Sequence, residues 1–244
     1  MFSREELNRY NRQMIMEGWG IETQKRLKES TVFIAGAGGL GSPVSIYLAV
    51  AGIGNIRICD FDVLDWSNLN RQILHNHNRI GTNKAASAKR TLEELNPDIN
   101  VVALAEKIVS ENVDTLVGDS AIIVDCMDNF PTRYILNEAA IRKDIPFVFG
   151  SIWGMEGRIS FIKPPETPCL RCIYPEAPPS ETFPVVGATP GVIGSLQALE
   201  VIKYFSGVGE NLKGKLMVWD GYRVEFKNYR AYKDPDCPVC SKIK

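Results

Sequence analysis

The stretch that decides the fold is Thr31-Val-Phe-Ile-Ala-Gly-Ala-Gly-Gly-Leu-Gly41, and a helix-like apolar segment follows it at 43–50. Residues 31–35 are apolar and β-branched, which is typical of a short buried strand. The glycines permit a tight turn and a close approach of the backbone to a ligand. The helix behind them would offer free N–H groups to a phosphate. The stretch therefore predicts a strand, a glycine turn and a helix.

A second predicted strand, 55–59, ends on Asp60, about 20 residues after the glycine turn, as a dinucleotide-type βαβ unit requires. A carboxylate at the tip of that strand can accept hydrogen bonds from ribose hydroxyls. The glycine pattern alone would also suit a packing turn in any Rossmann-like domain. Asp60 adds the ribose contact, so the two features together favour a nucleotide with a free ribose.

Strand-like and helix-like segments alternate as far as residue 150, which predicts an α/β fold with a parallel, doubly wound, Rossmann-like sheet. The segments 158–163 and 215–226 look like strands that need no crossover helix, so antiparallel strands are expected there, with one helix at 191–205 between them. We expect one domain over 1–244, with a nucleotide-binding part at 1–150 and a second part at 151–244. The other predicted elements are a helix from the Ser3–Glu6 capping box to Trp19, strands at 100–104, 121–126 and 146–150, and helices at 82–95, 110–117 and 132–142.

Composition restricts the partners of the chain. With 244 residues, of which 45% are hydrophobic and 23% charged, it can bury a large core. A net charge of -1 gives no overall field that would attract a polyanion, so nucleic acid is not expected. No apolar run has the length of a membrane span, and the first ten residues are unlike a signal peptide. We therefore expect a cytoplasmic protein that binds neither nucleic acid nor a membrane.

Two cations, Arg71 and Lys84, follow the predicted ribose site, and a third, Arg12, lies in the first predicted helix. A reaction that expels pyrophosphate needs cations against the β- and γ-phosphates, whereas an oxidoreductase does not. A lone Lys or Arg is more often a solvated surface charge, so the prediction rests on all three. Such chemistry requires no histidine, and His75 and His77 are interpreted as exposed loop residues.

The segment Val124-Asp-Cys-Met-Asp-Asn129 ends a predicted buried strand, where open α/β sheets place their ligands. The carboxylate of Asp128 could hold Mg²⁺ against a triphosphate. Two alternatives remain at this point. Asp125 could be the metal residue, or Asp128 and Asn129 could cap the following helix.

Four cysteines form two pairs, Cys169-Leu-Arg-Cys172 and Cys237-Pro-Val-Cys240. This spacing lets two thiolates bind one face of a tetrahedral Zn²⁺, and two such pairs complete a closed structural site. The metal would tie the C-terminal tail to the loop that precedes the first pair, and four protein ligands would leave no open position for catalysis. Unmetallated thiols are the alternative.

In their order and spacing, these motifs resemble the ThiF/MoeB/HesA family over nearly the whole chain. The resemblance is carried by Arg9-Tyr-Asn-Arg-Gln13, Gly36-Ala-Gly-Gly-Leu-Gly41, Asp60-Phe-Asp62, Ser67-Asn-Leu-Asn-Arg-Gln72, Lys84, Asp125-Cys-Met-Asp-Asn129, Gly191-Val-Ile-Gly-Ser-Leu-Gln197 and both cysteine pairs. It implies ATP and Mg²⁺, bound by Gly36, Gly38, Gly39, Gly41, Asp60, Ser67, Asn68, Leu69, Asn70, Arg71, Lys84, Asp128 and Asn129. It also implies a homodimer in which Arg12 reaches the nucleotide of the neighbouring subunit, and a ThiS- or MoaD-like sulfur-carrier protein with a Gly-Gly C-terminus as substrate.

The expected function is adenylation of the carrier's C-terminal carboxylate by ATP, with release of pyrophosphate. Catalysis would rest on positioning and charge neutralisation, with Arg12, Arg71, Lys84 and Asp128 as candidate catalytic residues. An NAD-linked oxidoreductase and a non-catalytic nucleotide-binding partner are the alternatives. The carrier's surface would decide whether molybdopterin, thiamine or another sulfur-containing product is served.

The proline-rich segment 174–190 is predicted to be a long mobile loop of the carrier-binding part, 151–244. It contains no cysteine, whereas family members that pass the carrier on as a thioester or persulfide have one there. The paired cysteines are assigned to metal, and Cys59 and Cys126 are interpreted as small core residues in strands that cannot swing. We therefore expect catalysis to end at the acyl-adenylate, which a separate sulfurtransferase would attack.

Overall fold

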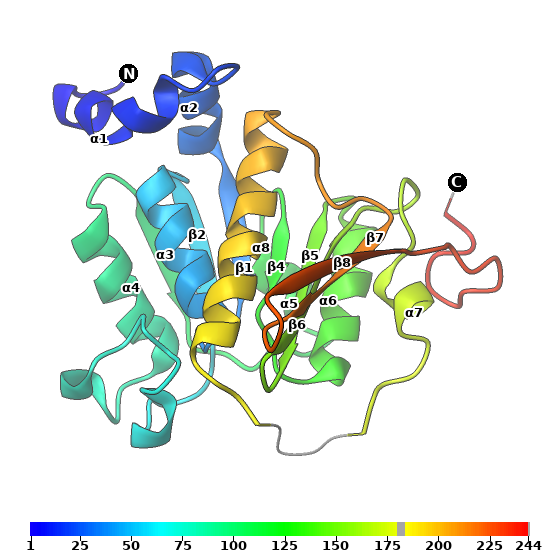
Figure 1. The fold of residues 1–244 in the computed structure, drawn as a ribbon. Coiled ribbons are helices and arrows are strands. Elements are labelled where there is room, and N and C mark those ends of the chain that lie inside the picture. Colours follow the sequence, from blue (N-terminus) through cyan, green and yellow to red (C-terminus); the bar gives the residue numbers. More distant parts are fainter. Residues whose placement is uncertain (180–183, 244) are drawn as a thin grey trace.

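A single eight-stranded sheet of order β3-β2-β1-β4-β5-β6-β7-β8 runs through the molecule (Figure 1). The computed structural model describes residues 1–179 and 184–243. The strands are β1 Thr31–Ala35, β2 Asn55–Cys59, β3 Asn100–Leu104, β4 Ile123–Asp125, β5 Phe147–Trp153, β6 Glu156–Ile162, β7 Lys215–Asp220 and β8 Glu225–Arg230. The α-helices are α1 Arg4–Met14, α2 Gly20–Glu29, α3 Gly41–Ala51, α4 Lys84–Leu95, α5 Val113–Val117, α6 Phe130–Arg142, α7 Leu170–Ile173 and α8 Ala188–Ser206, with 3-10 turns at Trp66–Asn68 and His77–Arg79.

The first five strands are parallel, and β6, β7 and β8 continue the sheet in antiparallel pairing. The predicted mixed sheet is therefore confirmed. Helices cover both faces (Figure 1). In β1, Val32 and Ile34 pack into the core that lies under α3, α4 and α8, while Phe33 and Ala35 pack on the opposite side with α5 and α6. Alternate side chains of a strand point to opposite faces, so this strand is apolar throughout because both of its faces are buried.

The first predicted helix is two helices in the structure. The capping box of Ser3 and Glu6 starts α1 as predicted, but α1 ends at Met14 and α2 begins only at Gly20. Gly18 has a φ of +78° and Gly20 has a φ of +65°. These two glycines break the helix, because few other residues adopt a positive φ. Both helices lie at the end of the sheet where β1 begins (Figure 1).

The predicted strand 215–226 is also wrong as one element, because it is a hairpin of β7 and β8. Asp220 accepts hydrogen bonds from the backbone N–H groups of Tyr222 and Arg223 and so turns the chain directly after β7. The dipeptide of Asp220 and Gly221 was the signal for this turn. All six side chains of β8 are exposed, and β8 is the edge of the sheet.

None of the helices in residues 1–179 and 184–243 is long and apolar enough to cross a lipid bilayer. The predicted mobile loop, 174–190, includes 180–183, which lie outside the described residues. Its far end is attached to the sheet, because Gly154 donates a backbone hydrogen bond of 2.8 Å to the Pro184 carbonyl.

Candidate functional site

The candidate site lies at the carboxyl end of β1, where the strand order reverses direction. Ala35, the last residue of β1, pairs with Cys59 of β2 on one side and with Asp125 of β4 on the other. The turns after these three parallel strands therefore lie side by side. In open α/β sheets such a reversal point forms a crevice that binds ligands.

The glycine turn after β1 is tight in two places. Gly36 has a φ of +101°, and a Cβ on it would lie 2.7 Å from the Cys126 carbonyl oxygen. A Cβ on Gly41 would lie 2.0 Å from the carbonyl oxygen of Gly36. These two glycines are therefore needed by the turn itself. A Cβ on Gly38 would lie 3.5 Å from the Gln72 side chain and one on Gly39 would lie 3.3 Å from Pro190, so these two glycines face side chains rather than the backbone of the turn.

The turn leads directly into α3, whose N-terminus carries no side-chain cap. The first N–H groups of a helix have no partner within the helix, and the helix dipole favours an anion at this end. The structure thus places the predicted phosphate-binding elements together, as the sequence indicates.

Asp60 is fixed beside the glycine turn by both of its carboxylate oxygens. Oδ2 accepts a hydrogen bond of 2.8 Å from the Ala37 N–H, and Oδ1 accepts one of 2.9 Å from the Asp62 N–H. Burial raises the pKa of Asp60, while these two N–H groups and the Lys84 ammonium act in the opposite direction. A carboxylate at the tip of this strand can accept hydrogen bonds from ribose hydroxyls.

Lys84 begins α4 and points to the loop that follows β2. Its Nζ donates to Asp62 Oδ2 at 2.9 Å, and 8% of the Lys84 side chain is exposed against 49% for Asp62. Asn83 caps α4 and also donates its amide to the carbonyls of Asp60 and Asp62. Sequence reasoning missed the roles of Asp62 and Asn83, although an Asn directly before a helix is an N-cap signal.

Arg71 lies over the glycine turn. Its Nη1 donates to the Ser67 carbonyl and to Asn70 Oδ1, both at 3.0 Å, and its Cγ would be 3.7 Å from a Cβ on Gly39. Around it, Ser67 donates to Asp65, and Asn68 completes a capping box with the same residue. The predicted stretch Ser67, Asn68, Leu69, Asn70 and Arg71 is thus a compact local turn at the rim of the site.

The chain that enters α8 closes the same side of the site, which sequence reasoning did not predict. A Cβ on Gly187 would lie 2.2 Å from the Asn70 carbonyl oxygen, and Pro190 would be 3.3 Å from a Cβ on Gly39. Both residues come from a region about a hundred residues or more away along the chain, and no local pattern links them to the glycine turn.

The three hypotheses for the turn after β4 are separated by its geometry. Asn129 caps α6 by accepting from the Thr132 N–H at 3.0 Å, and its amide donates to Asp128 Oδ1 at 3.2 Å. Asp125 is fully buried, and its Oδ2 lies 3.3 Å from Nε of Arg133. Asp125 therefore cannot reach a ligand, and Asp128 is the exposed carboxylate. A single exposed carboxylate after β4 suits Mg²⁺ if a phosphate binds at the glycine turn, because Mg²⁺ binds one or two protein carboxylates together with substrate phosphates.

Arg12 does not join the other predicted residues within one chain. It is exposed on α1, and its neighbour Gln13 donates to the Ala51 carbonyl at the last residue of α3. The eleven residues of α3 separate that point from the glycine turn by about 16 Å.

His75 is not the exposed loop residue that the sequence suggested. It is 7% exposed, its Nε2 is 2.8 Å from the Ala37 carbonyl oxygen and its Nδ1 is 2.9 Å from Ser87 Oγ. A carbonyl can only accept, so Nε2 carries the proton and Nδ1 accepts from the hydroxyl. His75 thus supports the glycine turn from below, and burial lowers its pKa. His77 is exposed, as predicted.

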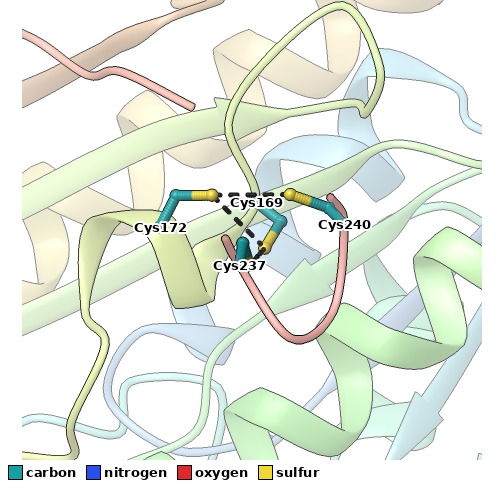
Figure 2. A group of neighbouring side chains, drawn as sticks. All are labelled: Cys169, Cys172, Cys237 and Cys240. Carbon is teal, nitrogen blue, oxygen red and sulfur yellow. Dashed lines mark hydrogen bonds between the residues drawn. The ribbon is translucent and has the colours of Figure 1, made fainter. Parts of the chain in front are cut away.

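The four paired cysteines meet at the start of α7, where the C-terminal tail returns to the sheet (Figure 2). Their sulfur atoms all lie within 4.8 Å of one another. The separations of Cys169 from Cys172, of Cys169 from Cys237 and of Cys172 from Cys240 are 3.9, 3.6 and 3.4 Å. A tetrahedral zinc with bonds of about 2.3 Å to sulfur would give edges of about 3.8 Å. The cluster therefore has the size and the donor set of a closed metal site.

Comparison with known proteins identifies the family of the chain. The profile of the ThiF family matches residues 10–239. The chain belongs to the ThiF family. It is 39% identical to the sulfur carrier protein adenylyltransferase of Thermus thermophilus, over 98% of this chain and 92% of that protein. It is 41% identical to the SAMP-activating enzyme E1 of Haloferax volcanii, over 97% and 90% of the two chains.

A longer relative, the adenylyltransferase and sulfurtransferase MOCS3 of Drosophila yakuba, is 41% identical over 97% of this chain, which spans about half of that protein (54%). Among solved structures, this member of the ThiF family is similar to MccB of E. coli in complex with MccA-N7isoASN, with a TM-score of 0.88 and 26% identity over 99% of this chain and 76% of that one. The structure of MccB with ATP gives a TM-score of 0.79 and 26% identity, over 90% and 69% of the two chains.

The burial of His75 predicts an acid sensitivity of the fold. Its pKa is lowered in the folded chain, so the unfolded chain binds a proton that the folded chain does not. This contribution to stability is complete above the unfolded pKa of about 6.5 and is lost as the pH falls below it. Between about pH 7.5 and about pH 5.5, Tm should therefore fall less in His75→Gln than in the wild type. Exposed His77→Gln should keep the wild-type dependence, and equal slopes in all three proteins would contradict the assignment.

Proposed function

We propose that this chain is an ATP-dependent adenylyltransferase that activates the C-terminal Gly-Gly carboxylate of a small ubiquitin-like sulfur-carrier protein as an acyl-adenylate. The observation that carries the proposal is the meeting of the glycine turn, Asp60, Arg71, Lys84 and Asp128 at the carboxyl ends of β1, β2 and β4. Membership of the ThiF family, and relatives named for carrier adenylation and activation, support it. We assign nucleotide binding to the part at 1–150 and carrier binding to the part at 151–244.

In this proposal ATP lies across the reversal point of the sheet. The glycine turn and the N-terminus of α3 receive the phosphates, because both present N–H groups to an anion. Asp60 receives the ribose hydroxyls. The 26% identity and similar fold of MccB, a protein solved with ATP, support ATP as the nucleotide.

The reaction joins a carboxylate oxygen of the carrier to the α-phosphorus of ATP, and the bond from that phosphorus to the oxygen bridging to the β-phosphate breaks. Pyrophosphate leaves with the electron pair. Arg71 and Lys84 neutralise the charge that grows on the phosphates. For this, the Lys84 ammonium would exchange its partner Asp62 for a phosphate. Lys84 and Asp62 both lie next to the proposed site. Mg²⁺, held by Asp128, would supply further neutralisation of the triphosphate.

Arg12 is assigned to the site of a partner subunit in a homodimer. It is exposed, and α1 lies about 16 Å from the glycine turn of its own chain. The neighbouring side chains Ile15, Met16 and Ile21 are apolar and exposed. An apolar patch of this kind is typical of a surface that another protein covers.

The proposed role of the cations predicts a large loss of rate when either is removed. Arg71→Ala or Lys84→Ala should lower carrier-dependent exchange of pyrophosphate into ATP by at least ~100-fold, the scale of one lost transition-state contact. Lys89→Ala is the matched control, because Lys89 is on the same helix as Lys84 but pairs with Glu93 on the surface. Exchange at the control level in both variants, with folding intact, would remove the two residues from the mechanism.

We propose further that the four cysteines bind one structural Zn²⁺. Sulfur separations near the tetrahedral edge and the thiolate donor set support zinc, and four protein ligands leave no open position for catalysis. Asp234 N–H donates to Cys172 Sγ at 3.4 Å, a contact that favours a thiolate. The ion would join the tail that follows β8 to the start of α7.

Freshly purified protein should contain about one zinc per chain by elemental analysis. Cys237→Ser should lose the metal and make the tail sensitive to protease, because the ion is a structural clip, while ATP binding remains. Cys59→Ala should keep the metal, since Cys59 is buried at the end of β2, outside the cluster. Purified protein without zinc, prepared without chelators, would count against the site.

We also propose that catalysis ends at the acyl-adenylate and that a separate sulfurtransferase supplies the sulfur. Cys59 and Cys126 are buried, as predicted, and burial raises the pKa of Cys59 to about 12 and the pKa of Cys126 well above its usual value. A buried, protonated thiol is a poor nucleophile. The segment 174–190 has no cysteine, although 180–183 lie outside the described residues.

The endpoint can be tested by incubating enzyme, ATP, Mg²⁺ and a Gly-Gly carrier, followed by a non-reducing gel and intact-mass analysis. Adenylated carrier should appear, and enzyme and carrier should migrate separately. The double variant Cys59→Ala and Cys126→Ala, which keeps the four paired cysteines, should behave in the same way. A thiol-sensitive covalent adduct of carrier and enzyme would refute the proposed endpoint.

A further inference from the structure

The pairing of strands β4 and β5 ends just before Asp128, the proposed magnesium ligand. Their described pairing ends at Val124 and Val148, one residue earlier than the pairing of β4 with β1. β5 continues to Trp153, whereas its pairing with β4 does not extend beyond Val148, and we call the space between the two chains after this point the gap. Asp128 lies three residues beyond this gap.

One side of the gap is bridged by Gln197 of α8. Its Nε2 donates to the Asp125 carbonyl at 2.7 Å and to the Val148 carbonyl at 3.2 Å. Gly150 makes the space, because a Cβ there would lie 2.4 Å from the Gln197 amide. The fully buried amide thus links the two strands at the point where their pairing ends.

The other side is bridged by Arg133 of α6. Its Nη2 donates to the Met127 carbonyl and, at 3.0 Å, to the Gly150 carbonyl of β5, while its Nε lies 3.3 Å from the Asp125 carboxylate. The guanidinium also lies over the rings of Phe130 and Phe149. Only 5% of Arg133 is exposed, so water does not compete for these contacts.

From these contacts, and resting on the proposed function, we infer that Arg133 and Gln197 are positioning residues for the divalent cation. Together they fix the backbone from Asp125 to Met127 across the gap and so set the place of the Asp128 carboxylate. Neither side chain touches ATP, the carrier or the metal in this assignment. They act through Asp128, whose other neighbour, Asn129, is fixed as the cap of α6.

A purely structural role for Arg133 is the alternative, and its contact with Met127 provides a way to test the two roles. Arg133 holds the carbonyl directly before Asp128 with the same nitrogen that holds β5. A lysine has one compact ammonium and cannot reproduce this planar contact with three groups. Arg133→Lys should therefore keep the buried charge beside Asp125 but release Met127. When a residue that holds a metal ligand in place is lost, metal affinity typically falls by roughly 10- to 100-fold.

The affinity can be measured without turnover, by electron paramagnetic resonance of Mn²⁺ with a non-hydrolysable ATP analogue. The Kd of Mn²⁺ should rise about 10-fold or more in Arg133→Lys and in the same direction in Gln197→Met. Asp128→Asn shows how far the Kd of Mn²⁺ rises when the proposed metal ligand itself is lost. Arg142→Lys is the matched control, since Arg142 lies on the same helix and pairs with Asp114 on the surface. In carrier-dependent exchange, high Mg²⁺ should restore the rate of Arg133→Lys more than that of Asp128→Asn.

Unchanged Mn²⁺ affinity in the folded variants, with only a lower Tm, would overturn the inference and leave the proposed function intact. If Arg133→Lys does not fold, Gln197→Met decides by the same measurement. A wild-type protein that binds the analogue but retains no Mn²⁺ would remove the premise that Asp128 holds the cation. Wild-type protein without carrier-dependent exchange would instead overturn the proposed function.

Discussion

The pairing of β1 with β2 on one side and β4 on the other is the constraint on which the rest of the structure depends. Because these strands are parallel, and Ala35 is in register with both Cys59 and Asp125, the three strands end at one level of the sheet. The turns that follow them therefore begin side by side. The glycine turn can fit only because Gly36 lies against the Cys126 carbonyl without a side chain. The groups that we propose for phosphate, ribose and metal thus come from separate parts of the sequence but share one edge.

The later half of the chain completes that edge. Gly187 and Pro190 pack on Arg71 and the glycine turn, and the same helix, α8, inserts Gln197 between β4 and β5. The elements that we propose for the nucleotide therefore pack against residues that follow them by more than 60 positions. Strands from both sides of residue 150 belong to one sheet, so the proposed division there concerns roles along the sequence.

Much of this arrangement could be predicted from sequence, because it depends on local patterns. The strand of Thr31–Ala35, the glycine turn, Asp60 and the cysteine pairs are each marked by residue type and spacing. His75 could not be recognised as buried, because the loop that carries it folds under a turn 38 residues away. The ion pair of Asp125 with Arg133 was equally hidden, since only the packing of α6 on the sheet shows which of two nearby aspartates keeps contact with solvent. The hairpin and the break between α1 and α2 did have local signals, in Gly18, Gly20 and the Asp-Gly turn.

The edge strand β8 has a consequence for the behaviour of the protein at high concentration. An unprotected edge offers backbone donors and acceptors on which another chain can build, and this is a route to aggregation. Along β8, the charged residues Glu225, Lys227 and Arg230 interrupt the aromatic residues Phe226 and Tyr229, and all of them are exposed. A second β8 laid parallel and in register would bring like charges together, whereas an antiparallel one centred between Lys227 and Asn228 would place Glu225 opposite Arg230. The charges of this edge therefore oppose parallel self-association, and antiparallel self-association is the one that they leave open.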